Sequence, residues 1–310
     1  MFHGFSEKIF KKVVAEMYPE NENYLELAST LSSRLTDSRK FLPIFSIDWF
    51  GLLKKLEGVE GEYGILAPIS TYKKLLAQIR DKGKPFFIDS GVFENKASAW
   101  YQQLHCEFNN GRWVREPRLA CEQILRCRVK DYLDRCDQFS PNYVFAPDIF
   151  GEPLLSLYLA RLSWEEYERR SRSYVLIGVV QVGAVLYNWS QKAVPVLDSF
   201  APHYDSPKSF LAPLISAYRD IGYEYIALGG LLKPDNTMPT GLRFGLSTEE
   251  LDELLTWSRP EFVLGGLALT RLEVLKKHSV WADSTNWLWW DARYDAKRFG
   301  NRNALQEVIG

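Results

Sequence analysis

Three acidic side chains stand at the ends of short apolar segments of the sequence. Asp89 and Asp283 each close one such segment, and Asp148 directly follows another. A carboxylate can attack an electron-poor carbon or transfer a proton, and retaining glycosidases use a pair of carboxylates for both tasks. The three acids therefore indicate nucleophilic and acid–base chemistry, provided that the fold brings them together.

An amide and several glycines occupy the same kind of place after other apolar segments. Gln181 and Gly183 follow one segment, Gly229 and Gly230 follow the next, and a further Gly-Gly pair follows Leu264. An acid or a glycine at such a place is often only a helix cap or a turn former. Their occurrence at successive segments indicates one shared site.

The elements that must position these residues are eight short segments rich in apolar, β-branched and aromatic residues. They are Phe41–Ile47, Tyr63–Ala67, Phe86–Asp89, Tyr143–Pro147, Val175–Gln181, Glu224–Leu228, Phe262–Leu264 and Ser279–Asp283. Strands that alternate with helices form a parallel sheet, and eight repeats close a (β/α)8 TIM barrel, an α/β fold. The carboxyl ends of the strands then meet at one mouth. A doubly wound open sheet is the alternative.

Helix start signals and the position of the first strand define the organisation of the chain. Ser247 with Glu250, and Thr270 with Glu273, have the spacing of capping boxes. We expect residues 1–40 to form an amino-terminal helical extension and residues 41–310 to form one barrel domain. A long insertion, at about 94–140, lies between the third and fourth strands.

The composition is that of a globular chain with its own core. The 310 residues are 46% hydrophobic and 25% charged, with a formal net charge of -1, which excludes a disordered or collagen-like chain. No run approaches the roughly 18 apolar residues of a membrane span, and the amino terminus is unlike a signal peptide. We therefore expect a cytoplasmic protein without membrane contact. The charge balance permits only a local basic surface for nucleic acid.

The cysteines predict no metal centre. The chain has 4 cysteines, all between Cys106 and Cys136, and their intervals match neither zinc-finger spacing nor C-x-x-C spacing. We expect free thiols on helices in a reducing compartment, with no metal and no cofactor.

The residues at the strand ends resemble the ordered signature of the tRNA-guanine transglycosylase superfamily. The matching motifs are Asp89-Ser90-Gly91-Val92-Phe93, Val180-Gln181-Val182-Gly183, Ala227-Leu228-Gly229-Gly230-Leu231 and Asp283-Ser284. The resemblance spans about 41–290, most of the chain. The compact length and the Ala-Pro-Asp-Ile-Phe-Gly segment around Asp148 look most like the DpdA branch, the DNA 7-deazaguanine transglycosylases of bacteria and phages.

The resemblance implies a pentosyltransferase that exchanges guanine in DNA for a free 7-deazaguanine base such as preQ0. It implies Asp283 as a nucleophile that forms a covalent glycosyl-aspartate, and Asp89 as the general acid and base. Exchange on one face of C1′ by two inversions needs such a nucleophile. The substrate-binding residues that the resemblance implies are Ser90, Gly91, Phe93, Asp148, Gln181, Gly183, Gly229 and Gly230, with Asp148 on the guanine edge.

Two departures from the family pattern bear on the substrate. Val92 and Val182 stand where family members usually have a second glycine, so the base or its 7-substituent is expected to sit differently. The zinc-binding C-x-C-x-x-C…His element of the tRNA enzymes is absent, because no cysteine follows Cys136. We read this as evidence against a structural zinc and in favour of DNA over tRNA.

A base inside a duplex must be flipped out before C1′ can be reached, and phosphate contacts must compensate for the unstacking. The basic residues expected to bind nucleic acid are Arg293, Lys297, Arg298 and Arg302. A second candidate set, in the predicted insertion, is Arg112, Arg115, Arg118, Arg126 and Arg128. The sequence leaves open whether an accessory protein opens the duplex and whether the chain forms a homodimer, as barrel transglycosylases often do.

The sequence leaves open three alternatives to exchange in DNA. The same exchange could act on tRNA. A glycoside hydrolase on the same barrel would use Asp89 and Asp283 as its retaining pair. A non-catalytic subunit would keep the fold and contribute only a nucleic-acid-binding surface.

Overall fold

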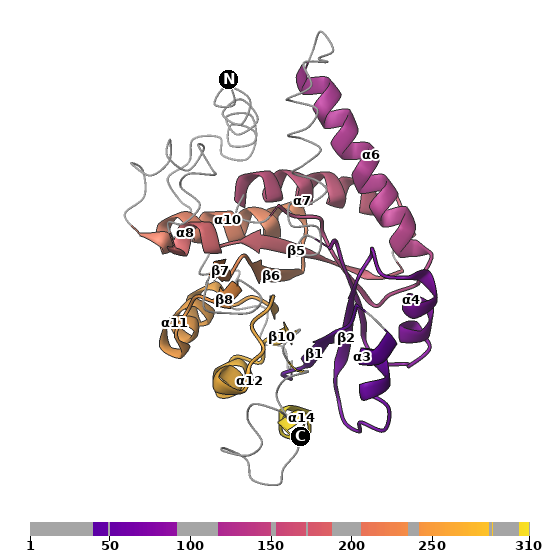
Figure 1. Ribbon diagram of the computed structural model, residues 1–310. Helices are drawn as coiled ribbons and strands as arrows, with labels where there is room; N and C mark the ends of the chain where they lie inside the picture. Colours follow the sequence, from indigo (N-terminus) through magenta and orange to yellow (C-terminus); the bar gives the residue numbers. More distant parts are fainter. Residues whose placement is uncertain are drawn as a thin grey trace.

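The computed structural model describes residues 40–48, 50–91, 117–149, 153–171, 173–187, 206–234, 242–284, 287 and 304–309. Within this part of the chain, parallel strands pair into a closed ring (Figure 1). In order around the ring they are β1 (Pro43–Ser46), β2 (Gly64–Pro68), β3 (Phe86–Asp89), β4 (Tyr143–Phe145), β5 (Val175–Gln181), β6 (Tyr225–Gly229), β9 (Phe262–Val263) and β10 (Trp281–Ser284). The predicted (β/α)8 barrel is thereby confirmed, and the open sheet is excluded.

Helices lead from each strand to the next along the outside of the ring (Figure 1). They are α3 (Phe50–Lys55), α4 (Lys73–Arg80), α6 (Pro117–Asp137), α7 (Pro153–Glu168), α8 (Gly183–Tyr187), α10 (Pro207–Ile221), α11 (Thr248–Ser258), α12 (Leu272–Lys277) and α14 (Ala304–Ile309). Between β6 and α11 the chain also forms an antiparallel pair, β7 (Leu232–Pro234) with β8 (Leu242–Phe244). The strand pattern of the sequence did not predict this pair.

The predicted extension and insertion fall largely on residues that the structure does not describe. Of residues 1–40, only Lys40 is described. Within the segment 94–140, helix α6 is the crossover that the barrel repeat requires between β3 and β4. Residues 92–116 lie outside the described part of the chain.

The predicted capping box at Ser247 is confirmed, and the one predicted at Thr270 is absent, so that prediction is wrong. The Ser247 hydroxyl accepts the N–H of Glu250 at 3.2 Å, and the Glu250 carboxylate accepts the N–H of Ser247 at 2.7 Å, at the start of α11. Thr270 instead lies inside a 3-10 turn, Leu269–Arg271, which begins after the extended residue Ala268. Helix α12 starts one turn later with no side-chain cap, because the tight turn already occupies the place that a cap would take.

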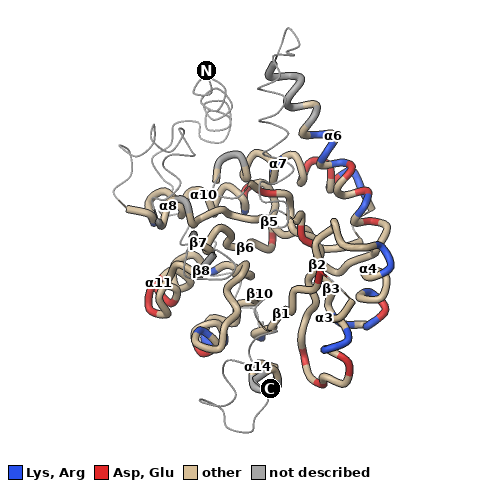
Figure 2. Tube along the Cα trace, in the orientation of Figure 1, with Lys and Arg blue, Asp and Glu red and all other residues tan. Residues whose placement is uncertain are grey.

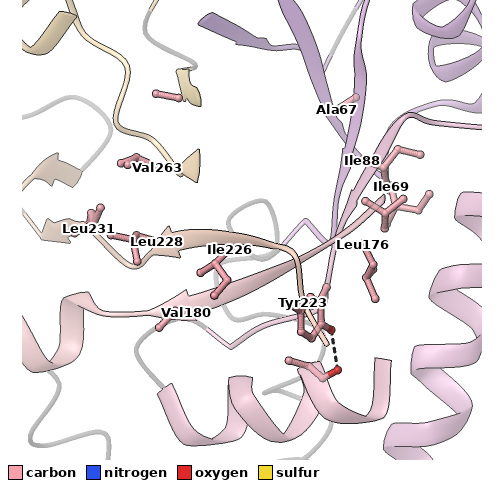
Figure 3. Close-up of a cluster of buried hydrophobic side chains, with 14 of the residues drawn as sticks. Ala67, Ile69, Ile88, Leu176, Val180, Tyr223, Ile226, Leu228, Leu231 and Val263 are labelled. Atoms are coloured by element: carbon pink, nitrogen blue, oxygen red, sulfur yellow. Dashed lines mark hydrogen bonds between the residues drawn. The ribbon is translucent and has the colours of Figure 1, made fainter. Parts of the chain in front are cut away.

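Buried side chains form two clusters, one on each side of the strand ring. The inner cluster fills the barrel, and its rings Phe87, Phe145 and Phe262 lie with centroids 4.8 to 6.2 Å apart. The outer cluster lies between strands and helices and includes Val180 and Leu228 (Figure 3). The two clusters are the two faces of the same strands, because successive side chains of a strand point in opposite directions.

Tyrosine hydroxyls connect the outer helices to the ring and to each other. The Tyr218 hydroxyl on α10 donates to the carbonyl of Val179 at 2.7 Å. The Tyr223 hydroxyl donates to the carbonyl of Ala160 on α7 at the same distance (Figure 3). These bonds satisfy the polar end of each buried ring, so the helices pack at a defined position.

None of the described helices is long and apolar enough to cross a membrane.

An ion pair between a part-buried arginine and a buried carboxylate holds β6, β9 and α10 together. Arg219 on α10 donates from Nη2 to both carboxylate oxygens of Glu261 at 2.8 and 2.7 Å, and Glu261 also accepts the N–H of Ile226 at 2.6 Å. We expect Arg219→Met to lower the free energy of unfolding by about 3 kcal/mol, because it leaves a buried carboxylate without its counter-charge. Urea unfolding of the purified variant measures this loss.

The matched control is Lys277→Met, which breaks an exposed ion pair with Asp252. Exposed pairs contribute little, so this variant should unfold close to the wild type. Equal losses in the two variants would contradict the role given to the ion pair of Arg219 and Glu261.

Candidate active site at the mouth of the barrel

Polar side chains continue the inner face of the strands at their carboxyl ends. Each stands two residues after an apolar or aromatic side chain that packs inside the barrel, so alternation directs it to the same inner face. These residues are Ser46, Asp89, Gln181 and Asp283, and Gly229 occupies the corresponding place on β6. The mouth of the barrel therefore collects most of the chemical groups that the sequence indicated.

Asp283 is held by two uncharged donors. The Ser46 hydroxyl donates to Oδ2 at 2.8 Å, and the backbone N–H of Gly265 donates to Oδ1 at 2.7 Å. The residue is 8% exposed, and its registered partner on β1 is the apolar Ile44. Burial raises the pKa of Asp283, and the bonds from Gly265 and Ser46 partly offset that rise.

The turn after β9 is shaped around this carboxylate. Gly265 has φ +67, a left-handed conformation that favours glycine, and it aims its N–H at Oδ1. Two residues later, the N–H of Leu267 donates to the backbone carbonyl of Asp283 at 3.0 Å. The glycine pair is recognisable as a turn from the sequence, whereas Ser46 is not recognisable as a site residue, because a serine that ends an apolar strand carries no motif.

Asp148 lies in a second hydrogen-bonded cluster at the mouth. Gln181 donates from Nε2 to Oδ2, and the Ser90 hydroxyl donates to Oδ1 at 3.3 Å. Burial and the nearby charge of Asp89 raise the pKa of Asp148 to about 7, although the bonds from Gln181 and Ser90 act in the opposite direction. This carboxyl group therefore changes its charge near neutral pH.

Asp89 is half-buried beside this second cluster. Its Oδ1 accepts the backbone N–H of Ser90 at 2.8 Å, and its backbone carbonyl accepts the N–H of Ile69 at 2.9 Å. Its charge acts on Asp148, as the raised pKa shows. Like charges that interact disfavour the doubly ionised state of the pair.

The glycines allow two backbone turns to approach each other. A Cβ on Gly183 would collide with the carbonyl oxygen of Gly230, and a Cβ on Gly229 would approach Gln181 Nε2 to 2.8 Å. Any larger residue at Gly183 would push the two turns apart. Gly91 is buried at the end of β3, so this glycine also lies at the mouth.

The structure brings together most, but not all, of the predicted site residues. Two hydrogen-bonded clusters are present: Asp283 with Ser46 and Gly265, and Asp148 with Ser90, Gln181 and the adjacent Asp89. Gly183, Gly229 and Gly230 adjoin Gln181 or one another. The predicted residues Phe93, Arg293, Lys297, Arg298 and Arg302 lie outside the described residues.

Several residues outside these two clusters make structural contacts. Val182 packs in the outer cluster, on the side of the helices. Trp287 is buried against Phe45 and donates to the carbonyl of Ser46 at 3.2 Å. In helix α6, basic and acidic residues are mixed (Figure 2), and Arg126 forms an ion pair with Glu165 at 2.7 Å. The ring nitrogen Nε2 of His278 lies 2.6 Å from Oδ1 of Asp252.

Within the described part of the chain, no group of three or more His, Cys, Asp and Glu side chains could hold a metal ion. Cys127 and Cys136 are free thiols, exposed and buried respectively.

Known proteins give no direct assignment for this chain. No known protein family matches it, and a search of curated proteins finds no match.

The raised pKa of Asp148 predicts how stability depends on pH. A carboxyl group whose pKa is higher in the folded than in the unfolded state binds its proton more tightly in the folded state. The free energy of unfolding therefore falls as pH rises from about 4 to about 7, because the proton is lost over this range. We expect Asp148→Asn to remove this decrease in stability. Relative to the wild type, the variant should gain on the order of 3 kcal/mol in free energy of unfolding between pH 4 and pH 8.

Urea unfolding of both proteins across this range measures the difference. Asp131→Asn, at an exposed position on α6, is the control and should show a difference that stays constant with pH. A constant difference for Asp148→Asn would contradict the raised pKa.

Proposed function

We propose that this chain is a base-exchange transglycosylase that replaces guanine in DNA with a 7-deazaguanine through a covalent bond between Asp283 and the sugar. The observation that supports this most is the setting of Asp283 at the barrel mouth, where an uncharged donor holds each carboxylate oxygen. The second cluster, with Asp89 and Asp148, supplies the groups that a departing base would need.

The contacts of Asp283 suit a nucleophile. Ser46 and Gly265 orient the carboxylate without cancelling its charge, and each oxygen keeps a further lone pair. Burial removes water and makes the group more basic. One oxygen can form a bond to C1′ while the bond from C1′ to the guanine nitrogen breaks and its electron pair passes to the base.

Asp89 suits the role of acid and base. In the first step it would donate its proton to the departing guanine, and in the second step it would take the proton from the ring nitrogen of the incoming base. That nitrogen then attacks C1′, and Asp283 leaves with its electron pair. Repulsion between the charges of Asp89 and Asp148 disfavours the doubly ionised pair. The first step requires that the retained proton lies on Asp89 and that Asp148 is ionised.

Asp148 and Gln181 suit the recognition of a guanine-like edge. An ionised carboxylate can accept from the ring N–H and the exocyclic amine of guanine, which 7-deazaguanines share. Gln181 fixes one oxygen of Asp148, and Gly229 and Gly230 bring the backbone of their turn close to the Gln181 amide, where a Cβ would collide. A flat ring is then read by hydrogen bonds at its edge.

The substrate in this proposal is DNA, with tRNA as the nearest alternative. The proposal takes its support for DNA from the missing cysteine-rich zinc element and from the resemblance around Asp148. The bases expected to enter are free 7-deazaguanines of the preQ0 kind, because a non-hydrogen substituent at position 7 does not change the edge that Asp148 would read.

Exchange of labelled guanine tests the chemistry without knowledge of the natural base. The full chain is incubated with radiolabelled guanine and either single-stranded DNA, duplex DNA or tRNA, and label in the polymer is counted. We expect label in DNA, a loss of about 10⁴-fold or more in Asp283→Asn, and a loss of about 10²- to 10⁴-fold in Asp89→Asn. Asp131→Asn should keep full activity.

The other outcomes separate the alternatives. Label only in tRNA would reassign the substrate. Release of guanine without incorporation of label would indicate a hydrolase. Full exchange by Asp283→Asn would overturn the covalent mechanism, and a covalent DNA adduct on Asp283, detected by mass spectrometry after acid quenching, would support it.

Removal of the Ser46 hydroxyl should shift the pH dependence of exchange. The hydroxyl favours the ionised, reactive form of Asp283, so Ser46→Ala raises the pKa of Asp283 further. We expect the acidic limb of the kcat/KM profile to move to higher pH by about one unit. Ser46→Thr keeps a hydroxyl, so its acidic limb should stay at the wild-type pH. An acidic limb that does not move in Ser46→Ala would contradict the role of the hydrogen bond from Ser46 to Asp283.

A further inference from the structure

Among the residues that the structure describes, two large apolar side chains are exposed, and both lie at the mouth of the barrel. Tyr72, in the turn between β2 and α4, is 74% exposed, and Phe50, which begins α3 after β1, is 37% exposed. Strands β1 and β2 are paired neighbours. The two aromatic side chains therefore lie on adjacent loops, at the same end of the barrel as Asp89 and Asp283.

The turn that carries Tyr72 is held rigidly and is tied to the proposed acid. The N–H of Ile69 donates to the backbone carbonyl of Asp89 at 2.9 Å. Arg135 on α6 donates to the carbonyl of Ile69 at 2.7 Å, and the Ile69 side chain packs in the outer cluster (Figure 3). The carbonyl of Tyr72 itself accepts the N–H of Leu75 at 2.8 Å. These bonds order the backbone of the turn from which the tyrosine ring extends into solvent.

The charges beside Tyr72 are positive. Lys73 and Lys74 follow it directly at the start of α4, and both are exposed. The first turn of α4 contains no acidic residue, although acids are favoured at that place. Basic positions along α4 are marked in Figure 2. We call these three consecutive exposed residues the rim patch (Tyr72, Lys73 and Lys74).

We propose that the rim patch binds the single-stranded DNA segment next to the target guanosine, with Tyr72 stacked on a neighbouring base and Lys73 and Lys74 on phosphates. This inference rests on the proposed function, since it assumes that a nucleotide enters the barrel mouth. A nucleotide that leaves its stack exposes the face of the adjacent base to water. An exposed aromatic ring covers such a face without sequence preference, and lysines next to it in the chain can neutralise phosphates of the strand.

Direct binding measurements test the rim patch independently of catalysis. Fluorescence anisotropy of a labelled single-stranded DNA is measured with the full chain carrying Asp283→Asn, alone and combined with rim substitutions. We expect Tyr72→Ala to weaken binding about 5- to 100-fold and Tyr72→Phe to keep it, because phenylalanine retains the stacking face. The double variant Lys73→Gln/Lys74→Gln should reduce the slope of log K against log salt concentration by about 1.4.

The chain offers a matched control for the two lysines. Lys54 and Lys55 are also consecutive and exposed, but they lie in the last turn of α3, toward the amino end of the barrel. Lys54→Gln/Lys55→Gln makes the same charge change and should leave both affinity and salt slope at the values of the parent chain.

The outcomes distinguish failure of the rim patch from failure of the proposed function. Wild-type affinity in Tyr72→Ala and in the Lys73/Lys74 double variant overturns the rim patch, even if label exchange succeeds. Loss of binding in these variants supports the rim patch, even if exchange into DNA fails and the proposed function falls. Binding only to tRNA, equal losses in the Lys54/Lys55 control, or no binding of any polynucleotide by the parent chain would each overturn the rim patch.

Discussion

Alternation of side chains on a closed ring of strands is the constraint on which the rest of the structure depends. In a closed barrel the inner face is sealed by neighbouring strands, so a polar group there must either reach the open end or find internal partners. Asp283 does both: it is paired in register with Ile44 of the apolar interior, retains slight exposure, and accepts bonds from Ser46 and Gly265. The same geometry that packs the core therefore sets the orientation and basicity of this carboxylate.

The two acidic clusters at the mouth differ in what surrounds them. Asp283 has only neutral donors on its oxygens, whereas Asp148 experiences the charge of Asp89 in addition to its burial. Such differences in environment give chemically identical acids different pKa values.

The loops after the strands combine rigidity with access. The turn after β9 wraps its amides around Asp283, and the turn after β2 is bonded to the backbone of Asp89 while it carries Tyr72 in solvent. Both turns are thus connected to the acidic residues at the mouth through a few hydrogen bonds from backbone N–H groups. In barrels of this kind the strands give a common frame, and the loops at their carboxyl ends carry function.

Local patterns in the sequence determined the strands, the barrel and the Ser247 cap, because alternation and capping depend on residues near one another in the chain. Asp89, Asp148, Gln181 and Asp283 could be proposed for the same reason, since each ends an apolar strand. Only the tertiary structure decided their partners: Ser46 and Asp283 are 237 positions apart in sequence, and their contact depends on ring closure and strand register. The β7–β8 pair, the tight turn at Thr270 and the exposure of Tyr72 were likewise decided by contacts and surfaces that no local pattern encodes.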